Sequence, residues 1–394
     1  MSVWYIDSSA GSGDLSGRDE NNPRPSYVGL KLSAGDSVLL KRGTAYRDAI
    51  VSESGSVNSP IFWGTWGEGE NPIVLGSVSA TLWKRISDSV WEWMQKDEGE
   101  VCNVIFNKGS SFGTLRWDID SLCENGDFFY SAYGSKEVGG GRLYLYCDKN
   151  PCDEWEDIEI ACFKKRNLAT AKENVIFEGI TFKNSGVHGF ASTNASGITM
   201  RNCRFENIGG CVWDAENKVR FGNGFELWNE AGDITVEGCV FDQIYDSALT
   251  HQGQKNGEYR TPSNISFINN TVSNCGMAAY EIRDKIPLRS RFSGNLCDNA
   301  GMGFSAQGDV RPRRWVLWPD PMGHHLFIWR MEKPTENGEL VIENNIFGFS
   351  FDGYAEYSTA SPEAQAQIVY RNNTVTCERP VMRLGKRLDA EALN

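Results

Sequence analysis

The stretch that decides the fold is "NVIFEGITF", residues 174–182, because variants of it return along the chain. The clearest further copies are "GITMRNCRF" (197–205), "DITVEGCVF" (233–241) and "NISFINNTV" (264–272), and others begin at 292, 339 and 367. Apolar and polar residues alternate within each copy, as in a β-strand with one buried face, and recurring "NN", "GN" and "SG" pairs indicate a turn. Each copy therefore predicts strand, turn and strand.

In the nine-residue copies, the residue five places after the first apolar residue forms one column of the repeat, called the special column below. Its members are Ile180, Cys203, Cys239, Asn270, Asn295, Asn345 and Asn373. The shortest interval, 23 residues from Ile180 to Cys203, suits one coil of three short strands. Stacked coils give a parallel β-solenoid whose backbone hydrogen bonds run between coils. We expect the asparagines to form an inward ladder and the longer intervals to be loops growing from one corner.

Three regions follow from where this pattern holds. We expect residues 1–79 to form an N-terminal cap and the first β-helix coils, because 36–77 contains three strand-like runs separated by Gly-rich turns. The pattern breaks over 80–165, where "GDFFYSAYGS" and "GRLYLYCDKNP" predict hairpins of a small inserted β module. Residues 166–394 then form the main parallel β-helix with long, cleft-forming loops.

Several of these stretches resemble a known superfamily. They are "AGDSVLLKRGTAYRDAI" (34–50), "SPIFWGTWGEGENPIVLGS" (59–77), the inserted "GDFFY" to "GRLYLYCDKNP", and "NGFELWNEAGDITVEGCVFDQIYDSALTHQG" (223–253). Together they are similar to bacterial carbohydrate-active proteins of the pectin-lyase-like superfamily. The resemblance implies an all-β, single-stranded, right-handed parallel β-helix. Because the family includes glycoside hydrolases, polysaccharide lyases and epimerases, the resemblance implies a carbohydrate substrate and leaves the reaction open.

Charge limits the partners. A net charge of -13 at pH 7 argues against nucleic acid and against an anionic membrane surface, since both require a concentrated positive field. A polyanionic sugar stays open, because basic residues cluster locally. These residues are Arg283, Lys285, Arg289 and Arg291, followed by Arg311, Arg313 and Arg314.

Location and cofactors are read from what the sequence lacks. It has no apolar run of the roughly 18 to 20 residues that a membrane span needs, and residues 1–20 do not resemble a signal peptide. We therefore expect a cytoplasmic protein, unless a leader has been removed. Eleven cysteines without a CxxC pair suit buried free thiols better than disulfides or a zinc site. No cofactor or metal motif is visible, and the adjacent His324 and His325 lack a third ligand at suitable spacing.

The segments that follow each copy can also be aligned. They are "HGFASTN" (188–194), "NGFELWN" (223–229), "DSALTHQ" (246–252), "AAYEIRD" (278–284) and "MGFSAQG" (302–308). The alignment directs Phe190, Phe225, Ala248, Tyr280 and Phe304 toward the core. The outward residues are then Glu226, Leu249, Glu281 and Ser305, with Trp228, His251, Arg283 and Gln307 two places further on.

Paired carboxylates on this outward surface predict a glycoside hydrolase. Glu226 and Glu281 would lie two coils, about 10 Å, apart. Inverting glycosidases separate acid and base by about 6.5 to 9.5 Å, which leaves room for the attacking water. We therefore expect Glu226 and Glu281 to be the acid and base of an inverting enzyme, with Asp246 as the alternate.

Two other functions use the same surface. In a lyase or epimerase on uronate sugars, His251 or Arg283 would remove the C5 proton while a neighbouring cation neutralises the sugar carboxylate. A further alternative is a non-catalytic carbohydrate-binding β-helix. Without any function, outward Glu, His and Arg on neighbouring coils would form a solvated ion-pair ladder.

Substrate contacts are expected from aromatic and polar residues around the carboxylates. The candidates are Trp228, Trp213, Gln252, Gln307, Arg314 and Trp315, with Trp318 and Trp329 as further possible platforms. His188 is interpreted as structural or peripheral. The expected partner is an oligo- or polysaccharide, and the oligomeric state is open.

Overall fold

A computed structural model of the chain describes residues 1–11, 15–94, 99–134, 140–165, 167–254, 258–307, 323–377, 381–383 and 386–388. Five of the residues singled out above lie outside these ranges: Arg311, Arg313, Arg314, Trp315 and Trp318.

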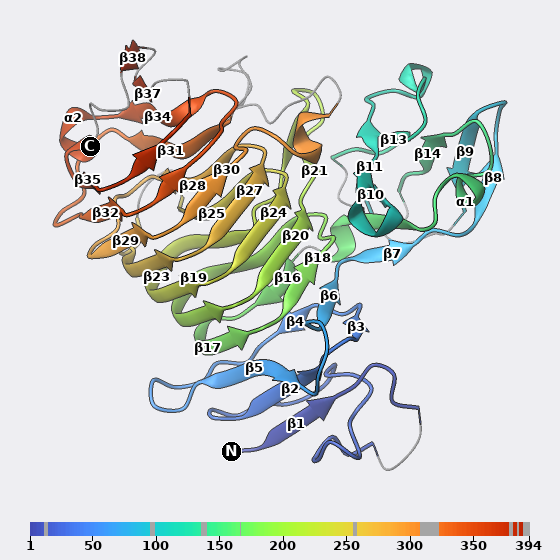
Figure 1. Ribbon diagram of the computed structural model, residues 1–394, viewed down its shortest axis with the longest axis horizontal. Coiled ribbons are helices and arrows are strands. Elements are labelled where there is room, and N and C mark those ends of the chain that lie inside the picture. Colours follow the sequence, from blue (N-terminus) through green and yellow to red (C-terminus); the bar gives the residue numbers. More distant parts are fainter. Residues whose placement is uncertain are drawn as a thin grey trace.

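The main body is a parallel β-helix, as the repeat predicted (Figure 1). Each coil contributes strands to three faces, and equivalent strands of successive coils pair in parallel. The first face carries the first half of each repeat. It consists of β1 (Val3–Ile6), β2 (Ser37–Lys41), β5 (Ile61–Trp66), β17 (Glu173–Glu178), β26 (Ser263–Ile268), β29 (Ser290–Ser293), β32 (Leu340–Glu343) and β35 (Ile368–Arg371), with the second halves of β19 (His188–Arg201) and β23 (Phe225–Glu237).

The second face is a sheet of nine short strands. They are β3 (Ala45–Tyr46), β6 (Ile73–Leu75), β18 (Thr181–Lys183), β20 (Arg204–Ile208), β24 (Val240–Ile244), β27 (Thr271–Cys275), β30 (Leu296–Asp298), β33 (Ile346–Phe347) and β36 (Thr374–Val375).

The third face, called the site face below, follows the aligned outward segments. It consists of β4 (Ile50–Val51), β16 (Asn167–Thr170), the first halves of β19 and β23, β25 (Ser247–Gln252), β28 (Ala278–Arg283), β31 (His324–Met331), β34 (Gly353–Ala360) and β37 (Val381–Arg383), which β38 (Lys386–Leu388) joins in antiparallel pairing.

The turn between the first two faces explains why the repeat contains Gly or Asn. The residue before the special column adopts a left-handed backbone, with φ of 69° at Gly179, 53° at Asn202 and 54° at Asn269. Such values are accessible to glycine and tolerated by asparagine. Each repeat is therefore bent at a fixed place.

The inward asparagine ladder is confirmed. Asn270 Nδ2 donates to Asn295 Oδ1 at 3.0 Å, Asn295 to Asn345 at 3.0 Å, and Asn345 to Asn373 at 2.9 Å. Each bond satisfies a buried amide from the next coil. The rest of the core is apolar and includes stacked rings, such as Phe190 on Phe225 with centroids 4.6 Å apart.

Residues 77–162 form two further sheets with a hydrophobic cluster of their own (Figure 1). One contains β7 (Ser77–Ser79), β10 (Val101–Phe106), β11 (Ser111–Phe112) and β15 (Ile158–Cys162). The other contains β8 (Trp83–Arg85), β9 (Val90–Trp93), β12 (Thr114–Leu115), β13 (Asp127–Tyr130) and β14 (Leu143–Tyr146). Buried Glu100 ties this module to the solenoid, because its carboxylate accepts the backbone N–H of Gly134 at 2.7 Å and of Val212 at 2.8 Å.

Helices are few. The α-helices α1 (Pro151–Glu154) and α2 (Pro362–Gln365) are single turns, and the 3-10 helices are η1 (Asn107–Gly109), η2 (Ile119–Ser121), η3 (Phe163–Lys165) and η4 (Phe304–Ala306). Within the described ranges no helix has the length and apolar character needed to cross a membrane.

Candidate functional site

Two acidic residues lie on the site face with one coil between them. Glu226 on β23 pairs with Thr250 on β25, and Thr250 pairs with Glu281 on β28. Glu226 and Glu281 are therefore two coils apart, the separation expected from the sequence. Both side chains are almost fully buried.

The expected register of the intervening coil is wrong by one residue. Leu249, and not Ala248, pairs with Phe225 and Tyr280 in the core column. Ala248 is also in the core, so two consecutive residues face inward near the start of β25. A shift of one residue exchanges the two faces of a strand. Leu249 therefore faces inward, and Thr250 takes the outward place between the two glutamates.

The same shift places His251 in the core, in register with Leu227 and Ile282. Its Nε2 lies 3.1 Å from the carbonyl oxygen of Lys285, which can only accept, so Nδ1 accepts from the Tyr280 hydroxyl at 3.0 Å. Burial lowers the pKa of His251 to about 4. The expectation that His251 faces the substrate is therefore corrected: it is a neutral core residue.

The coil after β28 also differs from the alignment. Strand β31, and not 302–308, continues the site face, so Phe327 and Trp329 follow Glu281 and Arg283. Phe304 and Ser305 instead belong to η4, and Gln307 is exposed just after it. Gln307 therefore does not share a column with Arg283.

Glu226 is held by amide groups. Gln252 Nε2 donates to Oε1 at 2.5 Å, and Asn223 Nδ2 donates to Oε2. His188 Nδ1 lies 3.7 Å from the same Oε2 and accepts the backbone N–H of Asn223 at 3.0 Å. Hydrogen bonds donated to a carboxylate favour its ionised form. Glu226 is therefore suited to act as a base.

Glu281 is held by different donors. Trp329 Nε1 donates to Oε1 at 2.7 Å, and Ser247 Oγ donates to Oε2 at 3.2 Å. Burial raises the pKa of Glu281, and the charge of Glu226 adds to this, whereas Arg283 and the two donors oppose it. The net shift is upward.

Asp246 precedes β25 and completes a group of three carboxylates. The residue keeps some exposed surface, yet burial of its carboxyl is the largest cause of a pKa raised well above the usual range. The charges of Glu281 and Glu226 raise this pKa further. In the described part of the chain no side chain donates a hydrogen bond to Asp246. It is therefore the carboxyl that keeps its proton most readily.

Thr250 adds a hydroxyl between the two glutamates. Its Oγ1 is fully buried and has no hydrogen-bond partner among the residues described. A buried polar atom without a partner marks a place for a water or a ligand. That place lies between Glu226 and Glu281.

Arg283 and two indoles border the carboxylates. The guanidinium lies 5.5 Å from the Trp228 ring and 4.7 Å from the Trp329 ring. It donates to Gln252 Oε1 and lies 3.3 Å from the carboxylate of Asp284. The side-chain amide of Gln252 thus links Arg283 to Glu226. Gln252 therefore holds site residues in place and is not a free substrate contact.

The basic cluster read from the sequence is divided by the fold. Lys285 directly follows this region and donates to the Tyr259 carbonyl. Arg289 and Arg291 belong instead to the first face, where they contact Asn264 and Ser266. The basic residues of 283–291 therefore do not form one continuous positive surface at the site.

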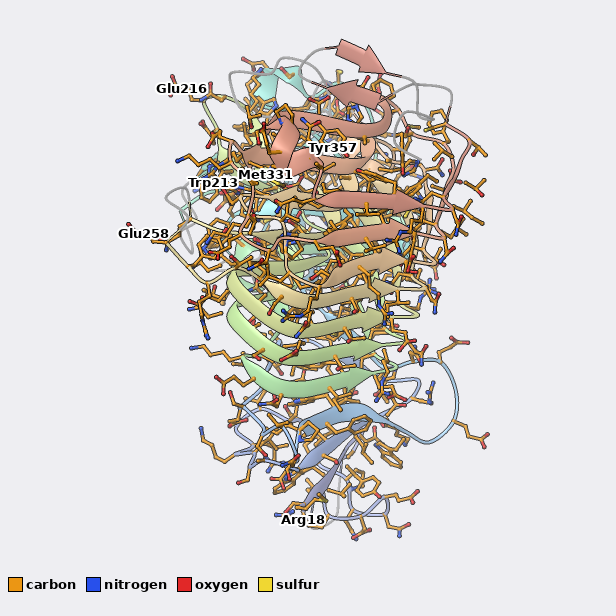
Figure 2. The ribbon with its side chains drawn as sticks, turned by 90° about the vertical axis from the view of Figure 1, so that its left-hand side faces the viewer. Arg18, Trp213, Glu216, Glu258, Met331 and Tyr357 are labelled. Carbon is orange, nitrogen blue, oxygen red and sulfur yellow. The ribbon has the colours of Figure 1, made fainter. Side chains whose placement is uncertain are left out.

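A hairpin lies beside the site. It is formed by β21 (Cys211–Asp214) and β22 (Val219–Phe221), and the Phe221 ring packs against His188 with centroids 5.7 Å apart. Trp213 packs edge-on against Phe221 and is 46% exposed. Figure 2 shows Trp213 and Glu216 of this hairpin at one side of the coil stack, the side that also bears Glu258.

Sequence reasoning missed three site residues, His188, Asn223 and Ser247, and it named Trp329 only as a possible sugar platform. The first three occupy one column, two residues before the core residue of successive coils. A signal was present, because polar residues recur in that column beside the acidic one. The hydrogen bond from Trp329 to Glu281 was missed because its coil was aligned with the wrong segment.

The described residues also contain one group with metal-type ligands, Glu100, Cys102 and Cys211, whose ligand atoms lie within 4.8 Å of one another. It lies at the junction with the inserted module, in a cluster with Val187 and Phe221. The backbone bonds to Glu100 described above account for its carboxylate.

The chain matches no protein-family model, and no curated protein matches it in sequence. Its structure is similar to that of the GH136 lacto-N-biosidase from Eubacterium ramulus, with a TM-score of 0.55 and 13% identity over 97% of this chain. The match covers 59% of that protein, so this chain spans about three fifths of its length. The alginate lyase from Paenibacillus sp. str. FPU-7 is similar over 90% of this chain and 86% of its own, with a TM-score of 0.50 and 9% identity. These likenesses show the parallel β-helix fold.

Proposed function

We propose that this chain is an inverting glycoside hydrolase in which Asp246 is the proton donor and Glu226 and Glu281 activate the attacking water. The observation that carries the proposal is that three carboxylates from three consecutive coils lie together, and the pKa values of two of them, Asp246 and Glu281, are raised by burial and by the charge of neighbouring carboxylates. Paired carboxyl groups with divided protonation are what glycosidic hydrolysis requires. The likeness to carbohydrate-processing enzymes supports a sugar substrate.

The division of roles follows from the hydrogen bonds. Asp246 keeps its proton and can transfer it to the glycosidic oxygen as the bond to the anomeric carbon breaks. Glu226 and Glu281 receive donors that favour the ionised form. A water near the Thr250 hydroxyl would lie between these two carboxylates, lose a proton to one of them and attack the anomeric carbon. A separate water and acid correspond to inversion.

A neutral sugar suits this site better than a uronate. A uronate carboxylate placed beside the ionised Glu226 and Glu281 would be repelled, and Arg283 already lies against Asp284. The lyase alternative also depended on His251, which is buried in the core with both ring nitrogens bonded. Arg283 is a cation beside the carboxylates, and it keeps the lyase as an outcome to be tested.

Trp228, Trp329 and Trp213 supply aromatic surface for a sugar. Trp228 and Trp329 are partly exposed on either side of Arg283, and Trp213 is exposed on the neighbouring hairpin. An indole face offers a large apolar surface that suits a sugar ring.

The test is incubation with a panel of neutral and uronic oligosaccharides, read both as new reducing ends and as ultraviolet absorbance of unsaturated uronate. We expect reducing ends without absorbance, and a product of inverted anomeric configuration by proton NMR. Glu226→Gln, Glu281→Gln and Asp246→Asn should each lower kcat by about 10²- to 10⁴-fold.

Glu237→Gln is the matched control, because Glu237 ends the same strand as Glu226 but belongs to the first face. Its activity should equal that of the unmodified protein. Absorbance rising with the reducing ends would replace the hydrolase by a lyase. Full activity in all three carboxylate variants would remove the proposed acid and bases.

A further inference from the structure

A second group of polar residues lies further along the site face. His324 begins β31, Asp352 directly precedes β34, and Glu356 lies on β34. Glu356 occupies the same column as Glu226 and Glu281, and His324 the same column as His188. The group is therefore placed on the coils as the first one is, with Phe327 in the column position between Glu281 and Glu356.

The two histidines differ in one respect. His188 Nδ1 accepts a backbone N–H from Asn223 on the next coil. Gly353 occupies the equivalent place above His324 and also has a backbone N–H, yet neither ring nitrogen of His324 has a hydrogen-bond partner in the described ranges, although the residue is only 2% exposed. Burial of an imidazole without hydrogen bonds is unfavourable, so we expect this ring to bond a water or a ligand.

The spacing around His324 shows what would fit. Its Nε2 lies 3.6 Å from Asp352 Oδ2 and 3.9 Å from Glu356 Oε2, both too long for direct hydrogen bonds. One oxygen atom between them would be within reach of all three groups, as a bridging water or a ligand hydroxyl is. Burial lowers the pKa of His324 to about 4, with a smaller contribution from His325 and against the opposing charge of Asp352, so the ring is neutral at pH 7 and presents one donor and one acceptor. A hydroxyl, which both donates and accepts, matches this set.

We propose that His324, Asp352 and Glu356 form a second saccharide-binding subsite, which holds a hydroxyl-bearing sugar unit of the oligosaccharide that is cleaved at Glu226, Asp246 and Glu281. This inference rests on the proposed hydrolase and specifies its substrate. Coils rise by about 4.8 Å, so Glu356 lies about 10 Å from Glu281 and about 19 Å from Glu226 along the axis. The substrate is therefore an oligosaccharide that extends from the carboxylates toward the C-terminal coils and is long enough to reach His324.

The experiment compares kcat and KM over a series of oligosaccharides of increasing length, built on the sugar cleaved in the panel. His324→Ala should raise KM about 10-fold for the longer members, the equivalent of one or two hydrogen bonds, with kcat unchanged. The shortest cleaved member should be unaffected, because it does not reach the subsite. Asp352→Asn should show the same dependence on length and disturbs the fold less, since the Asp352 side chain is partly exposed.

Glu343→Gln on the first face is the control for a change of charge and should alter no member of the series. A loss of equal size at every length, or no loss at any length, would overturn the subsite while leaving the hydrolase intact. If the unmodified protein cleaves nothing, the hydrolase fails, and calorimetry of oligosaccharide binding then decides the subsite alone. Length-dependent affinity that His324→Ala removes would support it, and absence of binding would overturn it.

Discussion

Replacing Trp329 by Phe should move the acidic limb of the pH–rate profile toward higher pH. The change keeps an aromatic ring and removes the N–H that donates to Glu281 Oε1 at 2.7 Å. A hydrogen bond to a charged group contributes about 1.5 to 3 kcal/mol, and about 1.4 kcal/mol corresponds to one pH unit. Because Glu281 is buried, little of this is lost to solvent. The group that must be ionised would then titrate about 1 to 2 pH units higher.

The measurement is kcat/KM as a function of pH for the sugar identified in the panel. Trp228→Phe is the matched control, because Trp228 borders Arg283 in the same column and makes no hydrogen bond to a carboxylate in the described structure. Its acidic limb should stay in place. If Trp329→Phe leaves this limb unmoved, Glu281 is not the base; if it moves the alkaline limb instead, Glu281 acts as the acid.

Three further predictions concern stability and the water. Asn295→Ala should destabilise the fold by about 3 to 5 kcal/mol in chemical denaturation, because it removes bonds to Asn270, Asn345 and the Phe267 carbonyl and leaves buried groups unpaired; a loss below about 1 kcal/mol would mean that the ladder adds little. Asp246 has a pKa raised on folding, so its stabilising effect is complete below the unfolded-state pKa and is lost as pH rises through the folded-state pKa. Asp246→Asn should therefore raise Tm at neutral and alkaline pH and leave it unchanged in strong acid, and an equal effect at both would contradict the raised pKa. Thr250→Val should lower kcat about 10-fold without lowering Tm, since it removes one hydrogen bond to the water and no bond within the protein; unchanged kcat would place the water elsewhere.

The coil architecture was predictable because two local signals agree. Alternation in the repeat predicts strands, and a Gly or Asn at one place is required by a left-handed backbone, as at Gly179 and Asn269. The inward amides were predictable for a related reason: an asparagine that recurs inside an apolar pattern must find a partner, and the equivalent residue of the next coil, such as Asn295 for Asn270, is the nearest one.

The outward register was less predictable because alternation ends at the bends of a coil. At Phe225 and Tyr280 an aromatic residue marks the core column, and the adjacent Glu226 and Glu281 were placed correctly. The coil between them has no aromatic residue in that column, so Leu249 could not be distinguished from its small neighbour by pattern alone. The coil after Glu281 was aligned wrongly for the opposite reason. Its core-column residue, Leu326, is not aromatic, whereas Phe304 is aromatic but belongs to η4.

This one-residue difference bears on the choice between reaction classes. With His251 outward, a base other than a carboxylate would stand between Trp228 and Arg283, and proton abstraction from a uronate would be the stronger alternative. With His251 inward, its place on the site face is taken by Gln252, whose amide joins Glu226 to Arg283, and Thr250 faces outward between the glutamates. An amide and a hydroxyl cannot remove a carbon-bound proton at neutral pH, but both can hold a carboxylate and a water in place. The residues between the two glutamates therefore favour activation of water, which is the chemistry of hydrolysis.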